Sequence, residues 1–241
     1  MPDATKTQAA AAGTGACAPA GHDLATLLTL FTASFPIGGF AYSHGLEAAV
    51  REGAICCAED AAGWVALLVA RGSGWNDLVL MAAAHRALRA GSVGALAELG
   101  DLAAALAGSA ERRAETRLLG DAFAAAARPF LAGTQMSDGA AGAGALPVVA
   151  GAVAAAAGLR LDHALTAYAH NFSSGLVSAA VRLVPLGQSE WVAVMAELRS
   201  SVASSAARAS VSTLDDLGSS ALVSEIAAMR HETLETRLFR S

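Results

Sequence analysis

The chain has 241 residues, of which 54% are hydrophobic and 15% charged, and its formal net charge is −5. This length suffices for one sizeable domain, and the apolar content excludes disorder over most of the chain. Lys6 is the only lysine, and the scattered arginines form no basic stripe, which argues against a nucleic-acid partner. Alanine and glycine are abundant whereas aromatic residues reach only 5%, so this composition favours closely packed helices over a β-sandwich.

The cysteines and the apolar stretches indicate a soluble cytoplasmic protein. Cys17, Cys56 and Cys57 form no disulfide framework, because their number is odd and two of them are adjacent. A reducing compartment is therefore expected. The uncharged stretch 24–43 is interrupted by Pro36 and two glycines, so we expect no membrane span there.

The N-terminal part of the chain changes character after residue 22. Residues 1–22 are small, polar and punctuated by glycine and proline, and we expect them to be disordered. The next segment has an apolar helical stripe that Pro36 terminates. The stripe consists of Leu24, Leu27, Leu28, Phe31 and Phe35. A Gly-Gly turn then leads into a second helix at about 42–52.

Further helices follow along the chain. They are predicted at about 58–70, 75–90, 147–157, 162–183, 189–208 and 221–229. Two more are predicted to begin after Ser92 and after Ser109, each of which is expected to be an N-cap. Segments 133–146 and 209–220 read as loops. The sequence therefore predicts one all-α domain of eight to ten helices over 23–230, followed by a polar tail, 231–241.

The helix after Ser109 begins with the most charged run in the chain. The run consists of Glu111, Arg112, Arg113, Glu115 and Arg117. Opposite charges in it lie three or four residues apart, which is typical of a solvated helix face.

No motif of catalysis or nucleotide binding is present. A P-loop needs a lysine that reaches the phosphates, and Lys6 lies in the N-terminal segment. There is no Gly-x-Ser-x-Gly nucleophile elbow. His231-Glu232 lacks the second histidine of a zincin helix, because that position is Glu235. The sequence thus predicts a binding or scaffold protein, not an enzyme, without a cofactor.

The potential metal ligands are dispersed. His163 and His170 could share a helix face, but two ligands rarely make a site, and each of the six histidines is expected to be a surface or capped residue. Cys56 and Cys57 are expected to be packing residues, with a transient soft-metal contact as the alternative. We therefore predict no metal site.

Four segments, taken in order, carry a family resemblance. Segment 35–47 has an apolar-Pro-x-Gly-Gly-aromatic start and a Gly-Leu-Glu end; 113–123 contains Arg-Ala-Glu-Thr-Arg; 182–188 follows; and 218–241 contains Arg-His-Glu-Thr and Arg-Leu-Phe-Arg-Ser. Together they resemble the UreF family of urease accessory proteins over residues 24–241. The departures are Leu234-Glu235, where many members have Gln-Tyr, and Ala41, where a hydroxyl is common.

The resemblance implies an all-α fold, usually dimeric, that bridges a UreD-type protein (also called UreH) and the GTPase UreG. That assembly docks on apo-urease and couples GTP hydrolysis to nickel insertion. The chain is therefore expected to be a non-enzymatic chaperone component. The alternative is a helical scaffold or metal-handling protein unrelated to urease.

The resemblance also implies where partners bind. Phe40 is expected on the surface where the UreD-type partner meets the tail, with core packing as the alternative. Arg182 is expected either to face UreG or to interact only with a helix dipole. Glu47 is expected to give structural support.

The tail carries the remaining candidates. Leu238 and Phe239 form an apolar pair that is expected to be an exposed, mobile anchor until a partner buries it. The full predicted partner-binding set is Phe40, Tyr42, Arg182, Arg237, Leu238, Phe239 and Arg240.

Overall fold

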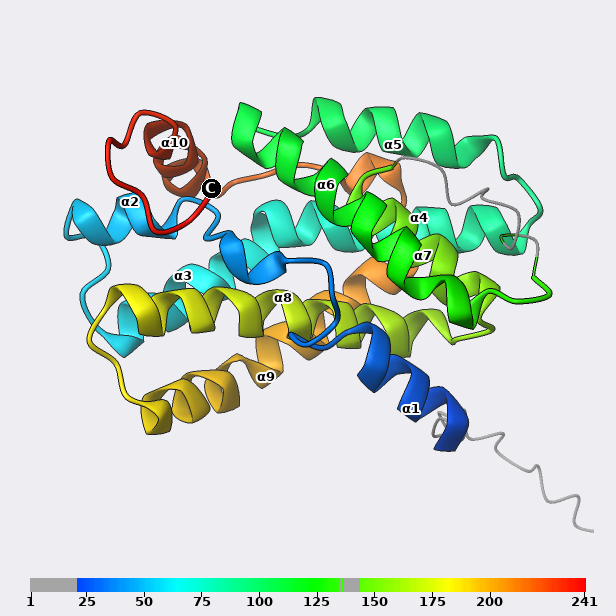
Figure 1. Ribbon diagram of the computed structural model, residues 1–241, viewed down its shortest axis with the longest axis horizontal. Coiled ribbons are helices and arrows are strands. Elements are labelled where there is room, and N and C mark those ends of the chain that lie inside the picture. The colour runs from blue at the N-terminus through cyan, green and yellow to red at the C-terminus, as the bar shows by residue number, and fades with distance from the viewer. Residues whose placement is uncertain (1–20, 135, 137–143) are drawn as a thin grey trace, which may run out of the picture.

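A computed structural model describes residues 21–134, 136 and 144–241, which form helices joined by turns and loops without a strand among them (Figure 1). The α-helices are α1 (Gly21–Leu30), α2 (Leu46–Arg51), α3 (Ala58–Arg71), α4 (Ser73–Arg89), α5 (Ala95–Ala105), α6 (Ala110–Ala127), α7 (Leu146–Ala156), α8 (Leu161–Leu183), α9 (Gln188–Val211) and α10 (Leu222–His231). Three short 3₁₀ helices are η1 (Gly39–Ala41), η2 (Arg128–Phe130) and η3 (Leu214–Asp216). The predicted all-α fold is confirmed.

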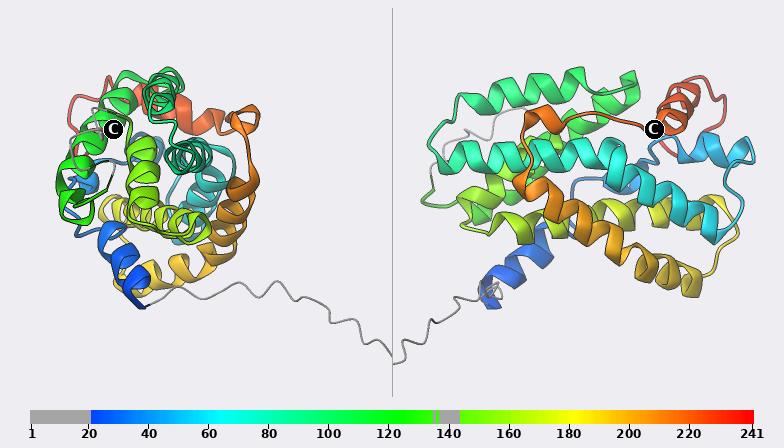
Figure 2. Two further views of the ribbon diagram at one scale, coloured as in Figure 1. Left: turned by 90° about the vertical axis from the view of Figure 1, so that its right-hand side faces the viewer. Right: turned by 180° about the vertical axis from the view of Figure 1, so that it is seen from behind.

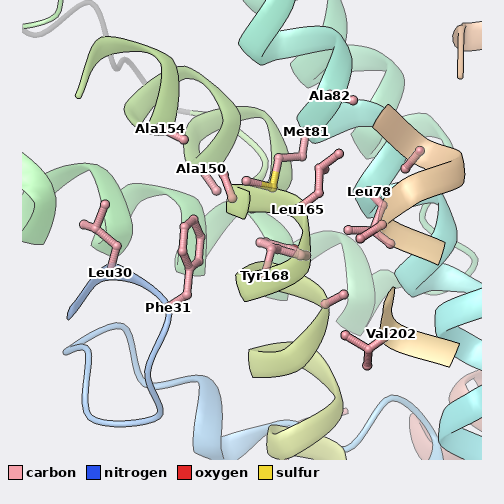
Figure 3. Packing of buried hydrophobic residues seen from close by; sticks show 14 of the residues in the cluster. Leu30, Phe31, Leu78, Met81, Ala82, Ala150, Ala154, Leu165, Tyr168 and Val202 are labelled. Atoms are coloured by element: carbon pink, nitrogen blue, oxygen red, sulfur yellow. The ribbon is translucent and has the colours of Figure 1, made fainter. Parts of the chain in front are cut away.

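Helix α4 lies at the centre of the bundle. It contacts α3, α5, α7, α8 and α9, and Figure 2 shows it alongside these helices in two further views. Most of its side chains are therefore buried, including Leu78 and Met81. Figure 3 shows Met81, Ala150 of α7 and Leu165 of α8 in one buried cluster.

Small residues let α4 and α7 approach closely. A Cβ atom at Gly151 of α7 would lie 2.3 Å from the carbonyl oxygen of Met81, so the two backbones touch where the side chain is absent. The rest of α7 is almost entirely buried alanine and valine. Close helix approach thus fills a core that contains few aromatic side chains, as the composition predicts.

The first two predicted helices are shorter than expected. Helix α1 ends at Leu30, and Leu24 and Leu28 are 46% and 65% exposed, so only part of the predicted stripe enters the core. Helix α2 begins at Leu46 because His44 and Gly45 have φ of 52° and 78°, which a right-handed helix excludes.

The predicted N-caps have different outcomes. Ser109 caps α6, since its Oγ accepts the N–H of Arg112 at 3.1 Å. Ser92 does not cap α5, which begins at Ala95 after Gly94.

Some predictions fall outside the described residues. Residues 1–20, with Lys6 and Cys17, and most of the predicted loop 133–146 are among them. Residues 21 and 22, expected to be disordered, begin α1. No helix in the described part of the chain is both long and apolar enough to cross a membrane.

A candidate partner-binding site around the C-terminal tail

The tail, 231–241, lies against segment 35–47, the first of the four family-like segments, which we call the Gly-Gly segment. The N–H of Arg240 donates to the carbonyl of Ala41 at 2.7 Å, and the N–H of Ser43 donates to the carbonyl of Ser241 at 2.6 Å. Figure 1 shows the end of the chain beside α2. The structure differs here from the expectation of a mobile tail. The polarity of the tail itself does not reveal that residues elsewhere in the chain offer hydrogen-bond partners to its backbone.

Glu47 of α2 holds the tail by its backbone. Its carboxylate accepts the N–H groups of Leu238 and Phe239, each at 2.9 Å, and the residue is 1% exposed. Burial raises the pKa of Glu47. The two N–H groups and His231 together lower it by more than burial raises it, so the net shift of the pKa is downward. This geometry fits the structural role expected of Glu47.

His231 links Glu47 to a second helix. Its Nε2 lies 3.2 Å from Glu47, and its Nδ1 lies 2.7 Å from Glu111 of α6. Glu111 also pairs with Arg237 of the tail. His231 is fully buried, so the expectation of a surface or capped histidine is wrong at this position.

A second charged group lies where the tail ends. Glu115 of α6 is 3% exposed and contacts Arg112 at 2.5 Å and His44 at 3.0 Å. The hydroxyl of Ser241 donates to the same carboxylate at 2.9 Å. The prediction of a solvated face is therefore wrong for Arg112 and Glu115, because the buried charges are satisfied by residues distant in sequence.

Electrostatics keep Glu115 ionised. Burial raises the pKa of its carboxyl, but the charges of Arg112 and His44 outweigh burial and bring the pKa to about 2. Neighbouring Asp77 behaves differently, since burial raises its pKa more than Arg112 lowers it. The hydroxyl of Tyr168 donates to Asp77 at 2.9 Å, and burial raises the pKa of Tyr168 well above its usual value.

These groups line a cleft of about 140 Å³. His44, Asp77, Arg112, Glu115 and Tyr168 contribute polar atoms. Its apolar wall comes from residues of the Gly-Gly segment and α8, among them Phe35, Ile37, Phe40, Phe172 and Leu176. The cleft thus lies between the Gly-Gly segment, α8 and the buried charges.

Arg182 contacts two of the other predicted partner-binding residues. It donates from Nη2 to the carbonyl oxygen of Phe40 at 2.6 Å, and its guanidinium carbon lies 4.3 Å from the ring centroid of Phe239. Phe239 is 3% exposed and Tyr42 7%, whereas Phe40 is 71% exposed and its side chain is not in the core. The expectation of Phe239 as an exposed anchor is wrong, because the ring packs inside the chain.

The exposed residues of this region define a surface. Leu238 is 60% exposed, and Arg237 and Arg240 are also exposed. We call Phe40, Arg237, Leu238 and Arg240 the tail surface. Tyr42, Arg182 and Phe239 support it from beneath or beside it.

Sequence reasoning missed the buried polar residues that fix this surface. They are His44, Asp77, Glu111, Arg112, Glu115, Tyr168 and His231. The available signal covers three of them, because only His44, Glu115 and His231 lie inside the family-like segments.

Comparisons with known proteins identify the family of the chain. A model of the UreF family matches residues 55–199. A protein named urease accessory protein UreF from Rhizobium etli is 48% identical over 223 residues, covering 91% of this chain and 98% of the relative. Proteins of the same name from Mesorhizobium japonicum and Agrobacterium fabrum are each 47% identical, covering 92% and 90% of this chain and 98% and 96% of their own lengths. The chain belongs to the UreF family.

Proposed function

We propose that this chain acts in urease maturation as a binding subunit that uses the tail surface to hold a UreD-type accessory protein. A member of the UreF family is a urease accessory protein whose family role is nickel insertion, together with UreD-type and UreG-type proteins. Within that role the chain contributes binding, while nucleotide hydrolysis belongs to the UreG-type GTPase. It works in the cytoplasm, as a homodimer, on apo-urease.

One observation carries the choice of surface. The tail is fixed to the Gly-Gly segment by backbone bonds, by Glu47 and by the contact of Arg182 with Phe239, yet Phe40 and Leu238 remain 71% and 60% exposed. Two large apolar side chains held outward on a rigid support lose little entropy on binding. Arg240 beside them suits a partner with carboxylates, because guanidinium pairs with carboxylate through two bonds, whereas Arg237 is already paired with Glu111.

The absence of a catalytic role is inferred from the chemistry of the cleft. Its ionisable groups are bonded to one another: Glu115 to Arg112 and His44, and Asp77 to Tyr168. Such saturated pairs stabilise a shape, whereas a general acid or base needs a free position toward a substrate.

The test replaces the exposed anchors in cells that produce urease. We expect Phe40→Ala with Leu238→Ala to reduce capture of the UreD-type protein at least about tenfold, as loss of two central apolar contacts does. Urease from that strain should be present at normal amounts but poor in nickel, measured by elemental analysis of the purified enzyme.

Leu118→Ala is the matched control, because Leu118 is 55% exposed on α6 and lies outside the tail surface. It should leave capture and nickel content unchanged. Full capture by the double variant would place the partner elsewhere on the chain. Normal nickel content after deletion of the whole gene would refute the maturation role itself.

A further inference from the structure

Two exposed thiols and a carboxylate gather where α3 begins. Cys56 and Cys57 are both exposed, so the expectation of packing residues is wrong. Ligand atoms from Cys56, Cys57 and Asp60 all lie within 4.8 Å of one another. These residues have no part in the tail surface or in the buried charges beneath it.

Backbone geometry explains how adjacent cysteines face one point. In a regular strand or helix neighbouring side chains diverge, but Cys57 is the extended residue before α3, with φ −145° and ψ 175°. Cys56 precedes it in the connecting turn. One turn later Asp60 accepts the N–H of Cys56 at 3.0 Å and its thiol at 3.2 Å. The hydrogen bond from the N–H of Cys56 would be enough to hold Asp60 at the start of the helix. That structural role does not require both thiols to lie beside the carboxylate.

The spacing matches the size of a metal ion's ligand shell. Two sulfur atoms bound to one ion at about 2.3 Å each lie no more than about 4.6 Å apart, and a bound carboxylate oxygen comes at about 2.0–2.2 Å. Rotation of the side chains about their Cα–Cβ bonds would bring the three ligand atoms closer, to the spacing of a four-coordinate site. Two thiolates with one carboxylate favour Zn²⁺ or Ni²⁺ over Mg²⁺ or Ca²⁺, which take oxygen ligands.

We propose that Cys56, Cys57 and Asp60 form an open surface site that binds one thiolate-preferring divalent ion, Ni²⁺ or Zn²⁺, per chain. Three protein ligands leave a fourth position for water or for a ligand from another molecule. Such a site suits capture and release of an ion, because both thiols are exposed and Asp60 is only partly buried. The proposal concerns the purified chain and does not depend on the proposed role in urease maturation.

Binding follows a balanced exchange of protons. The ion replaces the protons of both thiols, so each M²⁺ that binds releases two H⁺ and forms two metal–sulfur bonds and one metal–oxygen bond. Asp60 binds as a carboxylate and releases no proton. Because the ion displaces the thiol protons, affinity should rise with pH.

The test uses untagged full-length protein, kept reduced by a phosphine that does not chelate metals. Equilibrium dialysis against Ni²⁺ alone, and separately Zn²⁺ alone, should give one ion per chain. Bound Ni²⁺ should produce the near-ultraviolet absorption of a nickel–thiolate bond. Cys56→Ser and Cys57→Ser should each weaken binding by at least about tenfold, and Asp60→Asn by about tenfold, comparable to the loss of other groups at metal sites.

Cys17→Ser is the matched control, because it removes the only other cysteine. It should leave stoichiometry, affinity and absorption unchanged. Three results would each overturn the proposal: no saturable binding, binding that survives Cys56→Ser with Cys57→Ser, or binding lost in Cys17→Ser. A ratio of one ion to two chains would also overturn it, in favour of a site shared between two copies.

Discussion

At the scale of single residues, the molecule depends on charges that are buried but fully bonded. Removing a carboxylate from water costs several kcal/mol unless its oxygens find donors. Glu115 is bonded to Arg112, His44 and Ser241, and Glu47 to two backbone N–H groups of the tail. Each acid therefore ties together segments that are far apart in sequence, and its ionised form is the one that stabilises the fold.

Glu115 should make stability depend on acid pH. Its pKa is about 2 in the folded chain and near its ordinary value of 4.5 when unfolded. Between these values the unfolded chain binds more protons, so the stabilisation is complete above about pH 4.5 and is lost as the pH falls toward 2. The free energy of unfolding in urea should thus fall more steeply over this window in the wild type than in Glu115→Gln.

Asp77 acts in the opposite direction, since burial and the charge of Glu115 raise its pKa, so it offsets part of the difference in slope between the wild type and Glu115→Gln. Glu98→Gln, an exposed change on α5, should keep the wild-type slope. Equal slopes for the wild type and Glu115→Gln would mean that Glu115 does not have a lowered pKa in the folded chain.

At the scale of helices, the sequence predicts where each helix lies along the chain better than it predicts which residues surround it. The spacing of apolar residues locates α3, α4, α8 and α9 within a few residues, because helix periodicity is a local property. The salt-bridge spacing of the charged run in α6 predicts a solvated helix face, but the same spacing also occurs in a core. Only the fold brings His44 and Ser241 to Glu115.

The candidate site shows the same difference between what a local motif predicts and what only the tertiary contacts determine. The Gly-Gly segment and the tail are recognisable from their motifs, and Phe40 and Leu238 are exposed as expected of contact residues. The burial of Phe239 and Tyr42 depends on tertiary contacts, such as that of Arg182 with the Phe239 ring. No local pattern distinguishes a phenylalanine that binds a partner from one that anchors its own tail.

The close contact of α4 with α7 gives a test at this scale. Gly151→Ala would place a methyl group 2.3 Å from the carbonyl oxygen of Met81, so the helices must separate. We expect a loss of about 1–3 kcal/mol in the free energy of unfolding, the usual cost of overpacking. Gly63→Ala in α3 is the matched control: its Cβ meets nothing within 4 Å, and it should stabilise by about 0.4–1 kcal/mol. Equal effects of the two changes would show that α7 can move away freely.

At the scale of the whole molecule, the tail joins helices that lie far apart in the sequence. It contacts Glu47 of α2, Glu111 and Glu115 of α6, and Arg182 of α8. It also continues from α10, which packs against α2 where Gly45 leaves room for the backbone of Ala228. The surface proposed to bind a partner is thus built on a joint between several helices, and its shape depends on the tail being in place.

Removing residues 237–241 should therefore affect both stability and binding. The truncation exposes Glu47, deletes the Arg237–Glu111 pair and loses burial of Phe239, worth about 1.5–3 kcal/mol for the ring alone. At roughly 2–4 °C per kcal/mol for a chain of this size, we expect Tm to fall by roughly 5–15 °C, with the helical circular dichroism signal retained at 20 °C and capture of the UreD-type protein lost.

Two single variants separate the contributions within the tail. Phe239→Ala should lower Tm and weaken capture, because it removes a buried support. Leu238→Ala should weaken capture while leaving Tm within about 1 °C, since an exposed side chain away from special contacts changes stability little. A truncated chain that melts like the wild type would show that the tail is not part of the fold. If Leu238→Ala lowered Tm as much as Phe239→Ala does, the exposed anchor would be structural, and the tail surface would lose its main apolar contact for a partner.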